Sequence, residues 1–170
     1  TEEQLIYQGS VVLASTLDTR AGQRLTISSR TVSSIQFRLE KAGSPTGDVT
    51  FAIRKVSDDS LVASKVWGDA SELSASWAWK EVTFDTPVYI NEEVRIYCEF
   101  SGGNEFNSVK VADTVEDKKA GEYQSIYDDN WVARTSYDTT YKYTYTYSWT
   151  TTDWQNTLET DDTYYADLTE

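Results

Sequence analysis

Two runs of alternating apolar and polar residues, separated by a turn-forming segment, constrain the fold of this chain more than any other feature. Three apolar residues alternate with polar ones over residues 35–39, and three more do so over residues 49–53. Between them lies Gly-Ser-Pro-Thr-Gly at residues 43–47, and glycine and proline favour a chain reversal. An alternation of period two is typical of strands with one buried face. We therefore predict a β-hairpin over residues 33–56, which needs a second layer to cover its apolar face.

Short strand-like runs of the same kind recur along the rest of the chain, with turn-forming residues between them. They cover residues 4–13, 24–28, 61–67, 77–90, 94–100, 108–112, 123–127, 131–136, 141–149 and 163–168. Gly9 interrupts the first run, residues 68–75 favour a short helical turn, and turns are expected at 91–93 and 128–130. Strands at this spacing predict a single all-β domain over residues 1–170, a two-sheet antiparallel β-sandwich of jelly-roll type.

The charge balance restricts the partners of this chain. It contains 15 Lys and Arg against 28 Asp and Glu, which gives a net charge of -13. Such a field repels phosphate backbones and anionic lipids, so nucleic acid is not an expected partner. No apolar run is long enough to span a bilayer, and we expect no membrane insertion. Cations, neutral glycans and further copies of the chain remain as candidate partners.

The residues that most hydrolases use are missing from this sequence. The chain has no His, so it cannot build a Ser-His-Asp triad or a zinc site that uses His. Its single cysteine, Cys98, alternates in phase with apolar neighbours, which predicts a small core residue rather than a nucleophile. A carboxylate pair could still hydrolyse a glycoside, but no pattern selects one pair among the 28 acidic residues. We expect a protein that is not an enzyme.

The order of strands and turns resembles the jelly-roll modules of secreted microbial and viral surface proteins, including carbohydrate-binding modules and anchor-type surface domains. The resemblance covers about residues 20–148. Its elements are the strands at 32–39 and 49–53 around Gly-Ser-Pro-Thr-Gly, the run 77–84 followed by Thr-Pro-Val, the strand 94–100, Gly-Glu-Tyr at 121–123 and Asp-Asn-Trp at 129–131. The resemblance implies a non-catalytic surface or binding module. It does not extend to the residues after Trp149.

Paired acidic residues in turns are candidate ligands for a cation, since calcium prefers carboxylate and carbonyl oxygens. Such residues occur at 58–59, 113–117, 128–129 and 161–162, and none has the spacing of an EF-hand. Asp128 and Asp129 are the preferred candidates because their turn precedes Trp131. The alternative is that these are solvated turns and that no cofactor is bound.

Aromatic side chains are the candidate contacts for a glycan, because flat rings stack on the C–H faces of sugars. The candidates are Trp77, Trp79, Tyr127 and Trp131. Trp77 and Trp79 are predicted to share one strand face, with Ala78 and Lys80 on the other. Residues 141–149 carry an aromatic residue at every odd position. Core packing is the preferred interpretation of that aromatic ladder, and stacking on a sugar is the alternative.

Both terminal segments have the character of strands that could be exchanged between copies. These are residues 1–13 and 150–170, and an extended segment can add to the open edge of a neighbour's sheet. The residues predicted to pack on another copy are Leu5, Ile6, Val11, Val12, Tyr164, Tyr165 and Leu168. The alternative is that each terminus folds back on its own sheet.

Together these features predict a structural subunit of an extracellular or viral surface assembly, such as a filament or pilus, that is joined to other copies by strand addition. Abundant Tyr, Trp, Ser and Thr with no Met favour a secreted or surface-exposed location. The alternative function is a carbohydrate-binding or adhesive β-sandwich module.

Overall fold

The computed structural model describes residues 1–147, and over this range the protein is an all-β, antiparallel structure. In chain order the strands are β1 (Glu2–Gln4), β2 (Gly9–Leu13), β3 (Arg20–Ala42), β4 (Asp48–Lys55), β5 (Leu61–Asp69), β6 (Ala78–Glu99), β7 (Ser108–Thr114), β8 (Tyr123–Asp128), β9 (Asn130–Arg134), β10 (Asp138–Thr139) and β11 (Tyr141–Tyr147). The described residues include one 3-10 helix, η1 (Ala70–Glu72), in the segment predicted to form a helical turn. They contain no helix that is long and apolar enough to cross a membrane.

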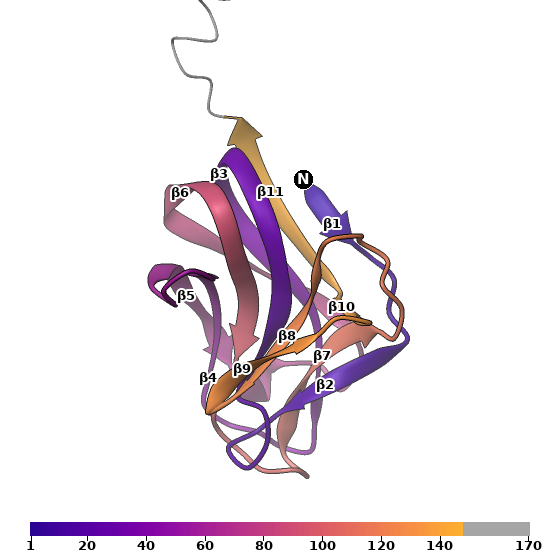
Figure 1. Ribbon diagram of the computed structural model, residues 1–170. Helices are drawn as coiled ribbons and strands as arrows, with labels where there is room; N and C mark the ends of the chain where they lie inside the picture. Colours follow the sequence, from indigo (N-terminus) through magenta and orange to yellow (C-terminus); the bar gives the residue numbers. More distant parts are fainter. Residues whose placement is uncertain (148–170) are drawn as a thin grey trace, which may run out of the picture.

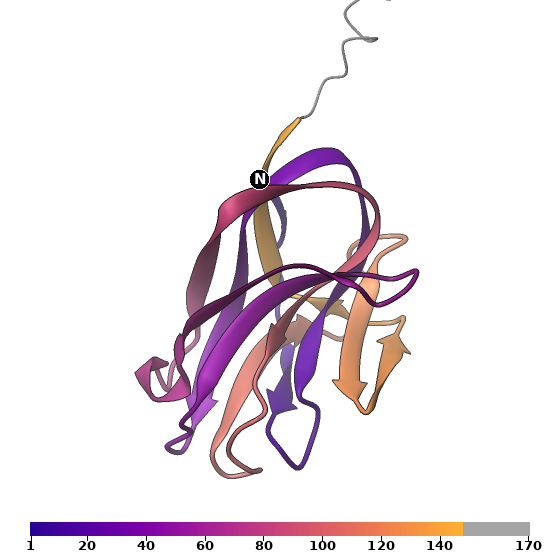
Figure 2. The same cartoon turned by 90° about the vertical axis from the view of Figure 1, so that its left-hand side faces the viewer.

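Two long strands, β3 and β6, form the centre of the sheet. They have 23 and 22 residues, and they pair with each other along most of their length. Figures 1 and 2 show them running side by side and curving together. The pairing register shifts between Ile27 and Arg30, where Ser29 has a φ of 49°, and again between Val32 and Ser34. Bulges of this kind increase the local bend of a strand, so the curvature coincides with the two irregular positions.

The predicted hairpin over residues 33–56 is wrong in its pairing, although both of its strands form. The sheet order is β1-β11-β3-β6-β4-β5, so β6 lies between β3 and β4. The glycine- and proline-containing segment at 43–47 is therefore a connection between strands that are not hydrogen-bonded to each other. It is held by two hydrogen bonds at the junction of β5 and η1, from Ala70 N to the Gly47 carbonyl and from Gly47 N to Asp69 Oδ2.

Two other predicted boundaries are also wrong. The runs at 24–28 and 33–39 belong to the single strand β3, and the expected turn at 91–93 lies inside β6. The run at 4–13 does divide into two short strands, but the break lies at residues 5–8, and Gly9 is the first residue of β2. The predicted turn at 128–130 is confirmed, since β8 and β9 pair as a hairpin whose turn residue Asp129 has a φ of 61°.

The eleven strands belong to one hydrogen-bonded sheet, and that sheet is not closed. Besides the main order, β7 pairs with β2, β3 and β10, while β8 pairs with β3 and β9. The predicted all-β antiparallel class is confirmed. The finer prediction of two separate jelly-roll sheets is not confirmed by this hydrogen-bonding pattern.

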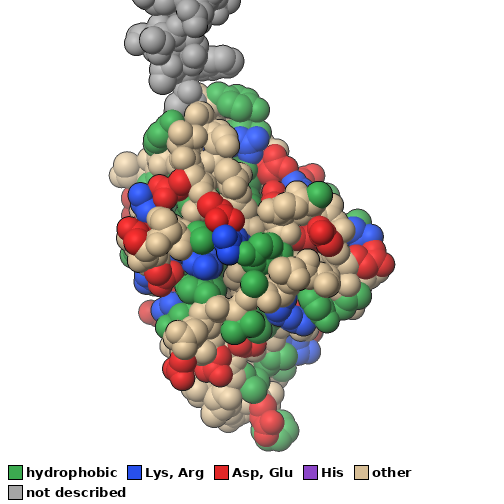
Figure 3. All heavy atoms as spheres, in the orientation of Figure 1, with side chains coloured by type: hydrophobic (Ala, Val, Ile, Leu, Met, Phe, Trp, Pro, Cys, Tyr) green, Lys and Arg blue, Asp and Glu red, His purple; other side chains and the backbone are tan. Residues whose placement is uncertain are grey.

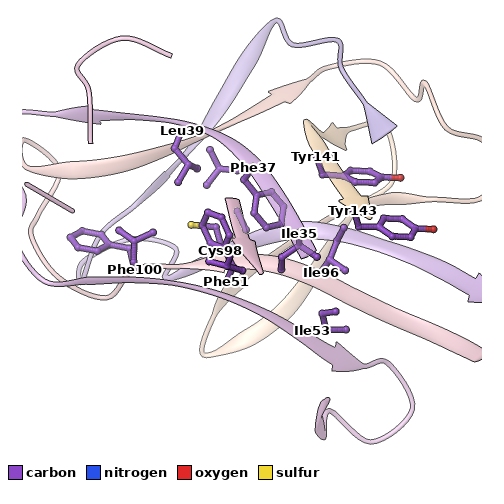
Figure 4. Close-up of a cluster of buried hydrophobic side chains, with 14 of the residues drawn as sticks. Ile35, Phe37, Leu39, Phe51, Ile53, Ile96, Cys98, Phe100, Tyr141 and Tyr143 are labelled. Atoms are coloured by element: carbon purple, nitrogen blue, oxygen red, sulfur yellow. The ribbon is translucent and has the colours of Figure 1, made fainter. Parts of the chain in front are cut away.

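One apolar core lies inside the curve of the sheet. The core residues labelled in Figure 4 come from β3, β4, β6 and β11, together with Phe100 next to β6. The six alternating residues of the 35–39 and 49–53 runs are all fully buried, as the pattern predicts. Cys98 is fully buried in the same cluster, which confirms its prediction as a core residue, and Tyr141 and Tyr143 extend the core into β11.

A buried polar cluster joins β10 to β3 at the side of this core. Asp138 is fully buried, and its carboxylate accepts hydrogen bonds from Gln23 and from the backbone N–H groups of Lys118 and Lys119. The Gln23 side chain in turn accepts from the backbone N–H of Thr139 at 2.8 Å. Because a buried carboxylate needs such partners, this cluster fixes the segment that leads into β11.

Candidate functional site

The structure separates the four predicted glycan-binding aromatics into two groups. The first group is Trp77 and Trp79: Trp79 of β6 is paired with Arg38 of β3, and Trp77 lies just before β6. The second group is Tyr127 and Trp131, which are paired across the β8–β9 hairpin. The prediction that Trp77 and Trp79 share a face opposite Ala78 and Lys80 agrees with the register, since Lys80 is paired with the buried Phe37. All four predicted aromatics are half-buried, so none is a fully exposed platform.

Trp77 and Trp79 belong to a surface that we call the Arg38 face, defined by Tyr7, Arg38, Trp77, Trp79 and Lys142. The rings of Tyr7 and Trp77 lie 5.8 Å apart with planes tilted by 53°. The Lys142 ammonium lies 4.5 Å from the ring centre of Trp79. These side chains come from β3, β6, β11 and the segment between β1 and β2, so only the folded sheet brings them together.

Arg38 lies at the centre of this face. Its guanidinium carbon is 3.9 Å from the ring centre of Tyr7, and its Nη2 donates a hydrogen bond to the Tyr7 hydroxyl at 3.1 Å. Its Nε atom is buried and has no hydrogen-bond partner among residues 1–147. The alternation of β3 predicts that Arg38 points away from the core. Its contact with Tyr7 has no sequence signal, because Tyr7 lies outside any strand.

Trp131 is enclosed on the outer side of the β8–β9 hairpin. Its ring lies 5.3 Å from that of Tyr97 and 5.2 Å from that of Tyr127, both in edge-to-face arrangements. Its Nε1 donates a hydrogen bond of 2.8 Å to Asp59, and the Arg95 guanidinium lies 4.9 Å from its ring centre. These contacts fasten the hairpin to β6 and to the turn before β5. Trp131 therefore has a structural role that the sequence does not reveal.

The arginine beside Trp131, Arg95, is matched with Asp59 at 3.8 Å, and two arginines of β3 are likewise matched with carboxylates of β6. Arg20 pairs with Glu99 at 3.2 Å, and Arg24 makes two hydrogen bonds to Glu93 at 2.6 and 2.7 Å. The second pair lowers the pKa of the Glu93 carboxyl, chiefly through the hydrogen bond from Arg24. Figure 3 shows basic, acidic and hydrophobic side chains intermixed on one face of the molecule. Such pairing leaves little unbalanced positive charge around Trp131.

A cleft of about 490 Å³ lies on the other side of the β8–β9 hairpin. It is lined by Ser10, Val11, Val12, Thr16, Leu17, Asp18, Asp128 and Arg134. Burial raises the pKa of Asp18, and the nearby charge of Asp128 raises it further. The Arg134 guanidinium forms an ion pair with the buried Asp113, with Nη1 lying 3.6 Å from Oδ2. The cleft has the volume of a small-ligand site and two carboxylates that repel each other.

The predicted calcium ligands lie at the tip of this hairpin. Asp128 is the last residue of β8 and lines the cleft, while Asp129 is an exposed turn residue. Within the part of the chain that the structure describes, no group of three or more Asp, Glu or Cys side chains could hold a metal ion. The calcium site at Asp128 and Asp129 therefore stays a prediction that the described contacts do not support.

The predicted assembly residues have different positions. Leu5 and Ile6 are 46% and 48% exposed, whereas Val11 is buried and Val12 half-buried on β2, which pairs with β7 of the same chain. The N-terminal segment thus lies on its own sheet here, which was the alternative. The C-terminal candidates Tyr164, Tyr165 and Leu168 lie outside the described residues.

The aromatic ladder of β11 changes from buried to exposed along its length. Tyr141 and Tyr143 are buried in the core, Tyr145 is half-buried, and Tyr147 is 60% exposed. Neighbouring rings contact one another throughout, and the Arg30 guanidinium lies 4.1 Å from the ring centre of Tyr145. Core packing thus accounts for the first half of the ladder, and the second half belongs to the surface.

Comparison with known proteins gives no family for this chain. No protein-family model matches it, and no curated protein matches it in sequence. Its function therefore has to be argued from its own residues. The Cys98 thiol is fully buried and its pKa is raised by burial, so it is a poor nucleophile. The described surface offers aromatic side chains, charged side chains and open strand edges.

Proposed function

We propose that this protein is a non-catalytic structural subunit of an extracellular or viral surface assembly, joined to neighbouring copies by strand addition. The observation that carries this proposal is the half-covered edge of β11. β1 pairs with Tyr141, Lys142 and Tyr143, and beyond them β1 ends. Within residues 1–147, the next three residues of β11, 144–146, pair with β3 alone. An added strand at this position would continue the line of β1.

The side chains at this edge favour strand addition. Natural edges are usually protected by charged residues, proline or bulges that prevent pairing with another chain. Residues 143–147 are all Tyr or Thr, which are strong strand formers, and none is charged. By contrast, the open edge at the start of β6 carries Pro87 and the inward-pointing Lys80. The β11 edge therefore lacks the proline and the inward-pointing charge of the β6 edge, and its one irregularity is the register shift between Thr144 and Tyr145.

We further infer that the curved sheet functions as the two facing layers of a jelly-roll-type sandwich. In support, Phe37 of β3 and Phe51 of β4 contact each other in the core although their strands are not paired. A sandwich of this kind has two sheet edges on each side, and an added strand completes one of them. The proposed donor is residues 163–168 of a neighbouring copy, with Tyr164, Tyr165 and Leu168 as packing residues.

Light scattering and negative-stain imaging of the full-length chain and of a chain ending at Trp149 test this proposal. We expect long polymers from the full-length chain and their loss on truncation. Polymers that survive truncation would move the donor to residues 1–13. A full-length chain that stays monomeric at every salt and calcium concentration would contradict assembly altogether.

A matched pair of variants separates strand donation from charge effects of the acidic C-terminal segment. Replacing Tyr164, Tyr165 and Leu168 by Ser removes the packing side chains of the proposed donor and is expected to abolish polymers. Replacing Asp161 and Asp162 by Asn changes only the charge of the same segment. We expect this control to assemble at least as well as the natural sequence, because two like charges are removed.

A further inference from the structure

We propose that the Arg38 face, defined above, binds a glycan by recognising the carboxylate of an acidic sugar unit. This site goes beyond assembly, since it would give each subunit a ligand of its own. Arg38 supplies the contact to the carboxylate, and Tyr7, Trp77 and Trp79 supply the aromatic surface beside it. Three features support this site: the lack of an acidic partner for Arg38 among residues 1–147, the rings around it, and the charge of the chain.

Arg38 differs from every other arginine in its charge environment. Each of the six other arginines lies within 4.0 Å of an Asp or Glu oxygen. Arg38 forms no such ion pair with residues 1–147, although the chain contains 28 acidic residues. A guanidinium has five N–H donors, and the described partner of this one is the neutral Tyr7 hydroxyl. Its charge is therefore available to an external anion.

The chemistry of the group selects a carboxylate. A guanidinium is planar and presents pairs of donors whose spacing matches the two oxygens of a carboxylate. Tyr7 lies over Arg38 at 3.9 Å and holds the group against the sheet, so its orientation is set before a ligand arrives. Preorganisation of this kind reduces the entropy that is lost on binding.

The surrounding rings select a sugar rather than a simple anion. Trp77 contacts Tyr7, and Trp79 is the direct cross-strand neighbour of Arg38. Both indoles lie on the outer side of the sheet and are half-buried, so each is held by its neighbours while part of it stays exposed. An indole adjacent to a charged group offers an apolar surface for the C–H face of a pyranose. The Lys142 ammonium, 4.5 Å from the Trp79 ring, is paired with Glu3 at 3.8 Å, so among residues 1–147 the unpaired charge of this face is that of Arg38.

The net charge of -13 restricts the ligand to a sparsely charged glycan. A polyanion such as nucleic acid or a densely sulfated chain would be repelled by the rest of the molecule. An oligosaccharide that carries a single uronic acid places one carboxylate at Arg38 and neutral rings elsewhere. Its repulsion by the protein is correspondingly small.

Calorimetric titration of the full-length chain tests this site with two matched probes. One is a xylo-oligosaccharide that carries a single glucuronate, and the other is the same oligosaccharide without it. We expect measurable binding of the first probe and at least about tenfold weaker binding of the second. Arg38→Gln should weaken binding of the acidic probe by about 10- to 100-fold, the range for a hydrogen bond to a charged group. Its affinity for the neutral probe should not change.

Lys80→Gln is the matched control, because it removes the same charge from a lysine on the opposite face of the same part of the sheet. We expect no change in affinity for this variant. Trp77→Ala leaves Arg38 in place and should weaken the binding of both probes. This variant tests the site if Arg38→Gln fails to fold. Equal affinity for both probes, no binding by the natural sequence, or equal losses in Arg38→Gln and Lys80→Gln would overturn the proposal. Light scattering on Arg38→Gln should show normal polymers. This measurement separates a loss of glycan binding from a failure of assembly.

Discussion

The rings of Phe37 and Phe51 meet edge to face in the core, with centroids 5.1 Å apart and planes at 88°, although β6 separates their strands within the sheet. The contact therefore lies across the inside of the curved sheet and does not join neighbouring strands. Both rings are fully buried. Edge-to-face pairs add stabilisation beyond that of burial alone, because the positive edge of one ring faces the negative surface of the other.

Phe37→Ala and Phe51→Ala should each lower the free energy of unfolding by about 3–5 kcal/mol, since each leaves a cavity in a fully buried site. The double variant should lose less than the sum of the two single losses, by about 0.5–1.5 kcal/mol. Urea denaturation of the four proteins measures this coupling. Strictly additive losses would show that the two rings do not interact across the core.

Gly22→Ala should destabilise the protein by at least about 3 kcal/mol, because there is no space for a side chain at this position. A Cβ there would lie 1.9 Å from the Ile96 carbonyl oxygen and 2.5 Å from Tyr97 Cα, and both are backbone atoms that cannot turn away. Gly68→Ala is the control, because its Cβ would meet only the flexible end of Glu72 at 3.2 Å. We expect a change below about 1 kcal/mol for this control. Thermal melting followed by circular dichroism distinguishes the two.

Glu122→Gln should stabilise the protein at neutral pH. Burial raises the pKa of the Glu122 carboxyl, which accepts a hydrogen bond of 2.6 Å from the Tyr141 hydroxyl. A raised pKa in the folded state means that this group destabilises the fold once the pH exceeds its ordinary value of 4.5. Below that value the carboxyl is protonated in both the folded and unfolded states.

The advantage of Glu122→Gln should therefore be largest at neutral pH, shrink as the pH falls through the raised folded-state pKa, and be lost below 4.5. Glutamine keeps an oxygen that can accept from Tyr141, so the hydrogen bond itself is retained. Urea denaturation of both proteins at a series of pH values measures the difference. A gap that grows towards acid would contradict the assigned direction of the pKa shift.

Lys80→Val should promote self-association through the edge of β6. Within the described chain, the first half of β6 is hydrogen-bonded to β3 only, and Lys80 is paired with the buried Phe37, so its charge points inward at this open edge. Inward-pointing charges at edges oppose pairing with another chain. Thr83→Val adds the same apolar side chain to the outer face and should leave association unchanged. Sedimentation velocity of both variants, each with the C-terminal segment removed after Trp149, measures the effect.

The alternation in the sequence predicts which residues are buried but not which strands are neighbours. All six alternating residues at 35–39 and 49–53 are buried as expected. The same pattern fits two strands that lie side by side and two strands that face each other, because period two specifies only the inner face. In this sheet the two facing strands are separated by a third strand. Here that strand is β6, about 30 residues further along the chain, and no local signal identifies it.

The candidate sites were predictable only where they depend on one strand. The shared outward face of Trp77 and Trp79 follows from their spacing, and the β8–β9 turn follows from its Asp and Asn residues. The contact of Tyr7 with Arg38 and Trp77 joins three segments that are distant in sequence. The enclosure of Trp131 by Tyr97 and Asp59 has the same origin. Such contacts depend on the order of strands in the sheet.

The partners of β3 have a consequence for the order in which the chain folds during synthesis. Every strand that pairs with β3 begins at residue 78 or later, and the last of them is β11. Among residues 1–77, β4 and β5 are the strands that pair with each other. The N-terminal half thus leaves the ribosome without most of its partners. Pairing over such long sequence separations is slow, so the nascent chain has to remain unaggregated until its final strand is made.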